Sequence, residues 1–290
     1  MLHCATRGCL SRLTLATAAL FSLAASFDTL GQSAPDLDVP YVTTPEHVVD
    51  AMLGLAQLKS SDFVLDLGSG DGRIVIQAAE KHGARGLGVE IDPKLVELSN
   101  ENARKAGVAD RARFVQQDLF ETNLGQASVI TMYLLPDVNL KLRPALLKLK
   151  PGTRVVSHDW DMGDWEPDAK VVVEVPDKKI GLKKESTLML WKVPARIDGA
   201  WSAGRVLHLQ LTQKYQMLSG IVRFRGQTYD HATGKMDGDR VHLCFAKYEN
   251  GRCRLGALGQ LAGSGLRLLV DGAGRQQALI IARRDGSAAR

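Results

Sequence analysis

The chain has 290 residues and a mass of 31.5 kDa, which is long enough for two ordinary domains. Hydrophobic residues make up 45% and charged residues 24%, so wholesale disorder, collagen-like repeats and coiled coils are excluded. The formal net charge is +5 without a run of clustered Lys and Arg, so we expect no nucleic-acid partner.

The first 34 residues are typical of an export signal or an N-terminal anchor. Arg7 and Arg12 precede residues 13–27, which carry no charge, and small residues lie at the end of this run. This pattern predicts a secretory signal peptide, because the run is shorter than the ~20 residues of a spanning helix. We expect an exported protein, periplasmic or envelope-associated, with no spanning segment in the mature chain. The alternative is an N-terminal extension on a cytoplasmic protein.

Residues 38–194 alternate helical and strand patterns, which predicts a parallel sheet with helices on both faces. A capping box at Thr43–Glu46 opens the first helix, Asp92 caps a later one, and a Leu-rich helix is interrupted at Pro144. A further helix is expected over residues 73–82. The expected strands are 63–67, 87–89, 113–115, 129–134, 154–157, 171–175 and 187–191. Seven strands in this order predict one doubly wound, mostly parallel α/β domain.

After residue 194 the apolar residues alternate with period two. Strands are expected at residues 207–211, 221–224, 241–245, 266–270 and 278–281, separated by turn signals at Ser219-Gly220, Asp237-Gly238, Asn250-Gly251 and Asp271-Gly272. Short strands at this spacing predict a small antiparallel sandwich or barrel over residues 195–290. This segment has no nucleophile–base pair, so we expect it to dock a substrate or another protein.

Four cysteines are present without a CxxC pair, so we expect no structural zinc site and no other metal. Cys244 and Cys253 flank the predicted Asn250-Gly251 hairpin turn, which pairs Cys253 with Tyr248. At roughly 3.3 Å per residue, Cys244 then lies about 13 Å further along its strand, too far for a disulfide. The spacing predicts two reduced cysteines.

A strand ending at Leu67 runs into a turn with glycine at positions 68, 70 and 72, and then into a helix. Glycine there permits positive φ and a close approach of a ligand to the main chain. A dinucleotide fingerprint needs its third glycine at position 73, where this chain has Arg73, and the Lys-Ser/Thr pair of a P-loop is absent. The turn therefore favours a ligand other than a pyrophosphate.

Two carboxylates follow the next two expected strands. Glu90 is placed to accept hydrogen bonds from both hydroxyls of a ribose, and Asp118 to accept one from an adenine amine. Ligands of open parallel sheets bind beyond the carboxyl ends of the strands, where the turn and both acids converge. The combination predicts a nucleoside site.

Residues 40–193 resemble class I S-adenosylmethionine-dependent methyltransferases. Asp66–Gly72 resembles the first motif of that family, Glu90 its ribose-binding acid and Asp118 its adenine-side acid. Pro40–Pro45, ahead of Gly68–Arg73, is similar to a group that includes lysine methyltransferases acting on the ATP synthase c subunit. The resemblance implies a Rossmann-like methyltransferase fold for the α/β domain and S-adenosylmethionine as the cofactor.

The same resemblance assigns roles within the predicted cofactor site. Asp66 is expected to orient the motif and face the methionine amino group, while Tyr41 and Thr43 close over the cofactor. The expected cofactor-binding residues are Tyr41, Thr43, Asp66, Gly68, Ser69, Gly70, Gly72, Glu90, Asp118 and Leu119.

Methyl transfer to an amine requires a positioned nucleophile that has lost its proton, which favours acidic and polar groups near the methyl. Tyr133 lies where many amine methyltransferases carry Asn/Asp-Pro-Pro-Tyr, but the amide or acid and the paired prolines are missing. This difference disfavours transfer to a nucleobase amine or a glutamine amide. Tyr133 is expected to line the methyl channel or to fill the edge of the sheet.

The segment Ser157–Trp165 holds three acids, a histidine and two tryptophans after the fifth expected strand. We expect Asp159 to be catalytic together with Tyr133. Trp160, Asp161 and Trp165 are expected to bind a cationic amine, because tryptophan offers a cation–π face. The alternatives are a metal site that includes His158 and a solvated loop whose tryptophans cover the core.

The sequence therefore predicts an S-adenosylmethionine-dependent methyltransferase acting on a protein amine such as lysine. The alternatives are a small-molecule methyltransferase and a non-catalytic nucleoside-binding protein of the cell envelope.

Overall fold

The computed structural model describes residues 41–178, 183–247, 250–272 and 278–286. The predicted signal segment 1–34 lies outside these residues. No helix in the described ranges is long and apolar enough to cross a membrane.

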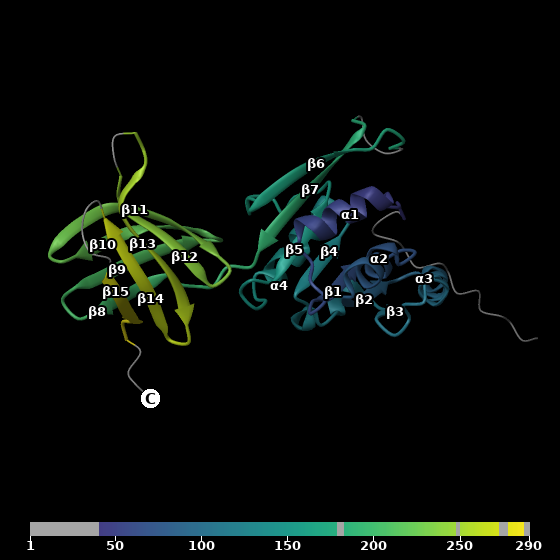
Figure 1. The fold of residues 1–290 in the computed structure, drawn as a ribbon, viewed down its shortest axis with the longest axis horizontal. Coiled ribbons are helices and arrows are strands. Elements are labelled where there is room, and N and C mark those ends of the chain that lie inside the picture. Colours follow the sequence, from purple (N-terminus) through teal and green to yellow (C-terminus); the bar gives the residue numbers. More distant parts are fainter. Residues whose placement is uncertain (1–40, 179–182, 248–249, 273–277, 287–290) are drawn as a thin grey trace, which may run out of the picture. The chain divides into compact units, whose positions relative to one another are not determined.

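The α/β region is built on a seven-stranded sheet, shown in Figure 1. Its strands are β1 Phe63–Leu67, β2 Arg85–Glu90, β3 Ala112–Gln116, β4 Val129–Met132, β5 Arg154–His158, β6 Ala169–Glu174 and β7 Glu185–Lys192. The spatial order is β3-β2-β1-β4-β5-β7-β6, and only β7 is antiparallel to its neighbours. The predicted Rossmann-like, mostly parallel sheet is confirmed.

Helices cover both faces of this sheet. They are α1 Glu46–Leu55, α2 Arg73–His82, α3 Pro93–Lys105 and α4 Pro136–Leu146, with short 3₁₀ turns at Leu119–Glu121 and Leu124–Gln126. Side chains alternate along each strand, so Val64 of β1 packs with α1 while Leu65 packs with α4. Figure 1 shows α1, in purple, lying against β5 to β7.

Two local predictions at helices are wrong. The N-cap of α1 is Pro45 and makes no side-chain cap hydrogen bond, because the helix begins at Glu46 itself, whereas a capping box needs this glutamate at the third helical position. Helix α4 continues through Pro144, which lies in its last turn. A proline so close to the end of a helix disrupts few backbone hydrogen bonds, so it does not interrupt the helix. Asp92 does cap α3, accepting a hydrogen bond from the backbone N–H of Lys94.

The order of the strands reverses between β1 and β4, since β1 continues to β2 and β3 on one side and β4 begins the other half. Ligands of such sheets bind beyond the strand ends at this reversal. The residues after β1, β2, β3 and β4 therefore face one region of space.

The C-terminal region is a closed eight-stranded antiparallel barrel. Its strands are β8 Gly199–Ala203, β9 Leu207–Lys214, β10 Met217–Phe224, β11 Gln227–Asp237, β12 Arg240–Lys247, β13 Cys253–Ala262, β14 Gly265–Gly272 and β15 Ala278–Arg284. Alternate apolar residues such as Leu207, Val222 and Leu268 fill its interior. The predicted all-β region is confirmed and its architecture is a barrel.

The sequence patterns do not identify β8, β11 and β13, and they misplace one turn. Ser219-Gly220 lies inside β10, at a register shift between Gly220 and Val222. A Cβ at Gly220 would lie 2.0 Å from the carbonyl oxygen of Gln210, so this glycine permits close strand pairing and does not form a turn.

Cys244 and Cys253 form a disulfide with a Cα–Cα distance of 5.6 Å, so the prediction of two reduced cysteines is wrong. The assumed regular hairpin does not occur, because the register of β12 and β13 shifts on both sides of Ala246. Cys244 pairs with Gly256, and a Cβ at Gly256 would lie only 3.0 Å from Sγ of Cys253. The absent side chain of Gly256 leaves room for the disulfide.

Candidate active site

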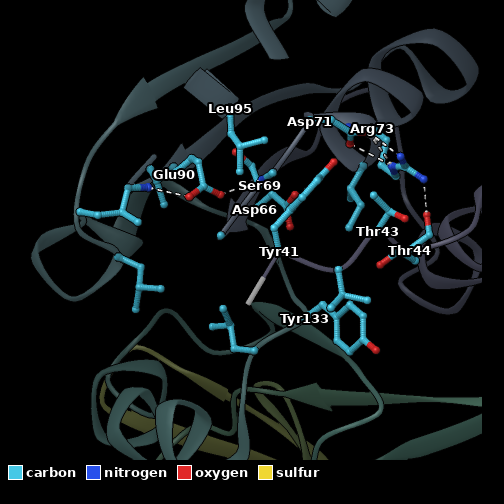
Figure 2. A pocket seen from close by; sticks show the side chains of 18 of the residues that line it. Tyr41, Thr43, Thr44, Asp66, Ser69, Asp71, Arg73, Glu90, Leu95 and Tyr133 are labelled. Atoms are coloured by element: carbon cyan, nitrogen blue, oxygen red, sulfur yellow. Dashed lines mark hydrogen bonds and ion pairs between the residues drawn. The ribbon is translucent and has the colours of Figure 1, made fainter. Parts of the chain in front are cut away.

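The glycine loop after β1 forms the floor of a cavity, shown in Figure 2. Gly68 and Gly70 have φ of 74° and 54°, a region that favours glycine, and both line the cavity. Ser69 between them is buried, and its Oγ has no hydrogen-bond partner among the described groups. The loop thus presents its main chain to a ligand, while the Ser69 hydroxyl is buried against Gly88 of β2.

Gly72 has a different role from the one predicted. It does not line the cavity, and a Cβ at this position would lie 2.6 Å from the ring of Phe114 and 2.8 Å from Cβ of Ser99. With φ of 83° it forms the N-cap of α2. Gly72 is required for packing at the start of α2 and makes no wall for a cofactor.

Glu90 ends β2 and holds the loop in place. Its Oε2 accepts a hydrogen bond from the backbone N–H of Gly70 at 2.9 Å. Its Oε1 accepts from the N–H groups of Ile91 at 2.8 Å and Asp92 at 3.1 Å. The carboxylate is buried and lines the cavity, so it fixes the loop and faces a ligand at once.

Asp66 is buried beneath the glycine loop and accepts a hydrogen bond from Oγ1 of Thr131 at 2.7 Å. Burial raises the pKa of Asp66 to about 7, Thr131 opposes the shift, and the charges of Glu90 and Asp71 add to it. A cation bound in the cavity would relieve this desolvation and repulsion. Asp66 therefore favours a positively charged ligand.

Asp118 and Leu119 line the same cavity after β3. The Asp118 carboxylate caps the 3₁₀ turn Leu119–Glu121, accepting from the N–H of Phe120 at 2.8 Å, and it is exposed. Phe120 also lines the cavity and is 44% exposed. This aromatic residue, which the sequence patterns do not identify, offers a flat face beside Asp118.

The segment before α1 closes the other side. Figure 2 shows Tyr41 beside Asp66 and Ser69, and a Cβ at Gly70 would lie 2.6 Å from its ring. Thr43 also lines the cavity. Arg73 pairs with Asp71 and donates to the carbonyl oxygen of Thr44 at 2.8 Å. Arg73 therefore ties the segment before α1 to the glycine loop.

A second cavity of about 350 Å³ adjoins the first. Both are lined by Val42, Thr43 and Tyr133, and the second is also lined by Pro45, His47, His158, Val175, Pro176, Asp177, Lys178 and Ser186. Two cavities that share walls suit a reaction in which one ligand transfers a group to another.

Tyr133 and Asp159 meet beside the second cavity. The Tyr133 hydroxyl donates to Oδ2 of Asp159 at 3.3 Å, and Nζ of Lys178 donates to the same oxygen at 2.6 Å. The N–H of Thr187 donates to Oδ1 of Asp159 at 2.9 Å. Burial and the neighbouring carboxylate raise the pKa of Tyr133 to about 12, so its hydroxyl stays protonated. Asp159 has φ of 64°, a strained conformation for a non-glycine residue and one found most often at functional sites.

His158 lies behind this group and is fully enclosed. Its Nε2 bonds to Oγ of Ser186 at 2.8 Å, Nδ1 bonds to Thr44, and its ring centre lies 3.9 Å from that of Tyr133. Burial lowers the pKa of His158 to about 4, with Asp159 opposing the shift. The ring is neutral at physiological pH, and it orients Tyr133.

Comparison with known proteins identifies the α/β region. The family described as ANTKMT methyltransferase domain matches residues 66–169. A protein-lysine N-methyltransferase of Saccharolobus islandicus is 47% identical over 141 residues, covering 48% of this chain and 86% of that protein. The chain belongs to this methyltransferase family.

Two further proteins are similar to about half of this chain. The adenine nucleotide translocase lysine N-methyltransferase of mouse is 36% identical, and the match covers 47% of this chain and 59% of that protein. A solved structure titled RNA methyltransferase from Salinibacter ruber, in complex with S-adenosyl-L-homocysteine, is 53% identical with a TM-score of 0.49. It covers 54% of this chain and 96% of that chain.

The cofactor of the methyltransferase is S-adenosylmethionine, and the first cavity fits it. The buried acids Asp66 and Glu90 suit its positive charge, and Glu90 and Asp118 offer acceptors for hydroxyl and amine groups. The bare main chain of Gly68 and Gly70 lines the space between them.

Most predicted cofactor residues meet in this cavity. They are Tyr41, Thr43, Asp66, Gly68, Ser69, Gly70, Glu90, Asp118 and Leu119. Asp71 and Arg73 also line this cavity and are not among the predicted residues, because the contact of Arg73 with Thr44 forms only in the folded chain. Lys178 is missing because it belongs to no motif.

The predicted substrate-binding residues of the methyltransferase do not meet. Trp165 is fully buried, and its carbonyl oxygen accepts a hydrogen bond from Trp191, so the prediction that it faces a substrate is wrong. Trp160 is 39% exposed and Asp161 is exposed, but neither lines the two cavities. Asp161 accepts from the N–H of Gly163 at 3.0 Å, which fixes the turn of this loop. The loop therefore acts as a cover for the core at Trp165.

The alternative metal site in the same loop does not form. Oδ2 of Asp159 lies 3.7 Å from Nε2 of His158, and Asp161 is turned toward Gly163. Over the described parts of the chain, no group of three or more His, Cys, Asp or Glu side chains is placed to hold a metal ion.

Proposed function

We propose that this methyltransferase modifies the side-chain amine of lysine in a protein. One observation carries the proposal: Asp159 binds the alkylammonium group of Lys178 at 2.6 Å. This contact lies beside the second cavity, which shares Tyr133 with the cofactor cavity. A lysine of a substrate offers the same group. The relatives named as lysine N-methyltransferases support lysine as the methyl acceptor.

The residues of the second cavity suit this chemistry. S-adenosylmethionine supplies an electrophilic methyl group on a sulfonium when it is bound. Asp159 would draw in the ammonium group and accept its proton, because an amine attacks only when its lone pair is free. Tyr133 would form the wall past which the amine reaches the cofactor cavity, and the neutral ring of His158 would hold Tyr133 in place. The enclosure would keep water from the reacting atoms.

The test is methyl transfer from labelled S-adenosylmethionine into a cell lysate, followed by separate protein, RNA and small-molecule fractions. We expect label in protein that survives ribonuclease and appears as methyl-lysine after acid hydrolysis. Label in the small-molecule fraction alone would favour the alternative of a small-molecule methyltransferase, and label in RNA would overturn the expected absence of a nucleic-acid partner. Calorimetric binding of the cofactor without transfer to any fraction would favour a non-catalytic binding protein.

We also propose that the barrel, within residues 195–290, docks an acidic surface of the protein substrate. This segment carries 15 Lys and Arg against 7 Asp and Glu, a formal net charge of +8, whereas the whole chain carries +5. The barrel therefore attracts anionic partners more strongly than the rest of the chain does. A KM for the protein substrate that rises with ionic strength, while the cofactor affinity stays constant, is the expected result; a KM insensitive to salt would contradict it.

We also propose that the protein is exported from the cytoplasm. The uncharged run 13–27 supports it, as does the disulfide between Cys244 and Cys253, because disulfides persist mainly in oxidising compartments. N-terminal sequencing of the natural protein tests it. A new N-terminus after the apolar run is expected, and an intact Met1 on a protein with free thiols would contradict export.

A further inference from the structure

The side-chain amine of Lys178 is placed at the second cavity as a methyl acceptor would be. Its Nζ donates to Oδ2 of Asp159 and to the carbonyl oxygen of Glu185, each at 2.6 Å. The Lys178 side chain is only 14% exposed. A primary ammonium has three hydrogens, so these two bonds leave one direction for the lone pair that attacks a methyl group.

Tyr133 links this amine to the cofactor cavity. Its ring lines both cavities, and its hydroxyl shares Oδ2 of Asp159 with Lys178. Figure 2 shows Tyr133 at the edge of the cofactor cavity with its hydroxyl pointing away from Glu90 and Ser69. The amine of Lys178 is therefore one side chain away from the space that the cofactor fills.

Neighbouring lysines in the chain provide a contrast. Lys183 forms an ion pair with Glu185 and its side chain is 82% exposed. Nζ of Lys184 donates to the carbonyl oxygen of Lys178 at 2.7 Å and is also exposed. Neither lines the second cavity. Accessibility would favour Lys183, whereas placement beside Tyr133 favours Lys178.

We propose that Lys178 is a self-methylation site, modified in cis by the methyltransferase that contains it. The inference rests on the proposed lysine activity and adds a specific internal acceptor. The ammonium of Lys178 first gives a proton to Asp159 along their hydrogen bond, and Asp159 passes it to water. The freed lone pair forms an N–C bond to the methyl carbon while the S–C bond breaks. The electron pair of that bond remains on sulfur, and S-adenosylhomocysteine leaves.

The experiment uses the purified full-length protein incubated with S-adenosylmethionine and mapped by mass spectrometry after cleavage at Glu. We expect a gain of one or more methyl groups at Lys178 and none at Lys183 or Lys184. The first-order rate should stay constant over a tenfold dilution, because transfer within one molecule does not depend on concentration. Asp159→Asn should remove the modification and keep cofactor binding, and Lys178→Arg, which retains a cation beside Asp159, should carry no methyl group.

Three outcomes would overturn the proposal. The first is an unmodified Lys178 in an enzyme that methylates lysate proteins, which leaves the lysine activity intact and removes only the internal acceptor. The second is modification of Lys183 at a similar rate, and the third is a rate proportional to concentration, which indicates transfer between molecules. Failure to bind the cofactor by calorimetry would instead overturn the proposed function itself.

Discussion

The two cavities of this methyltransferase are built in different ways. The cofactor cavity is built around the glycine loop and the residues that follow neighbouring strands, such as Gly68, Glu90 and Asp118. The second cavity is lined by residues from distant segments, since Thr43, Tyr133, His158 and Lys178 come together only in the folded chain. The difference separates a site fixed by local backbone from one that depends on long-range packing.

The largest effect on the cofactor cavity should come from replacing Glu90. Glu90→Ala removes the acceptor of three backbone N–H groups that shape the glycine loop and the expected acceptor of the ribose hydroxyls. Bonds to a charged acceptor contribute about 1.5–3 kcal/mol each, so cofactor affinity should fall by roughly 100-fold or more in calorimetry. Glu97→Ala, an exposed acid on α3, is the control and should bind normally. Unchanged affinity in the Glu90 variant would refute a cavity organised by this carboxylate.

The corresponding change beside the second cavity is Asp159→Asn, which alters the partner of Tyr133 and Lys178. The amide can still accept from the N–H of Thr187 but cannot take a proton from an amine. We expect kcat for methyl transfer to fall by about 100-fold, a typical loss for a general base, with cofactor affinity within twofold of wild type. Asp161→Asn, two residues away and bonded to Gly163 instead of Lys178 and Tyr133, should be close to wild type. If both variants lose activity equally, the loop as a whole matters and Asp159 has no special role.

Asp66 should make cofactor affinity depend on pH. The cationic cofactor prefers the carboxylate form, so below pH 7, near the pKa of Asp66, binding must first remove a proton. Affinity should weaken by up to about tenfold per pH unit below 7 and level off above it. Isothermal titration from pH 5.5 to 8.5 measures this profile.

Two variants identify the titrating group. Asp66→Asn should flatten the profile, and Thr131→Val, which removes the hydroxyl that favours the carboxylate, should move its bend to higher pH. A profile identical in all three proteins would assign the pH dependence to another group.

His158 should make the second cavity sensitive to acid. Its pKa is about 4 in the folded protein and 6.5 in an unfolded chain, so the unfolded state binds the proton more readily. Its contribution to stability is complete above pH 6.5 and is lost as the pH falls toward 4, by about 3 kcal/mol at most.

The measurement is the melting temperature between pH 4.5 and 7.5, compared with His158→Gln. The variant should lose less stability on acidification than wild type. His231→Gln, at an exposed position of β11, should behave like wild type. Parallel curves for wild type and His158→Gln would show that this ring does not limit acid stability.

The contrast between the cavities also explains what the sequence could predict. Glycine spacing, strand periodicity and acids at strand ends are local signals, and they predict the sheet, the glycine loop, Glu90 and Asp118. The other cavity residues, such as Tyr41, Thr43 and Asp66, follow from the family resemblance. The roles of Trp165 and Cys253 depend on packing and on bulges, which no local pattern reveals. Lys178 could not be found because its partner, Asp159, lies 19 residues away with no motif between them. The capping box failed because α1 begins at Glu46, so this glutamate does not occupy the third helical position that the pattern requires.

The short segment from Tyr41 to Thr44 belongs to neither a helix nor a strand, yet it contacts both cavities and the residues that hold them in place. Val42 and Thr43 form walls of both cavities, and Thr44 reaches His158 through its hydroxyl and Arg73 through its carbonyl. A shortened protein starting at Glu46 would keep every helix and strand of the sheet and would be expected to fold. Both cavities would nevertheless lose the wall that they share. Proteolytic removal of the N-terminus, or a tag added there, must therefore leave these four residues in position.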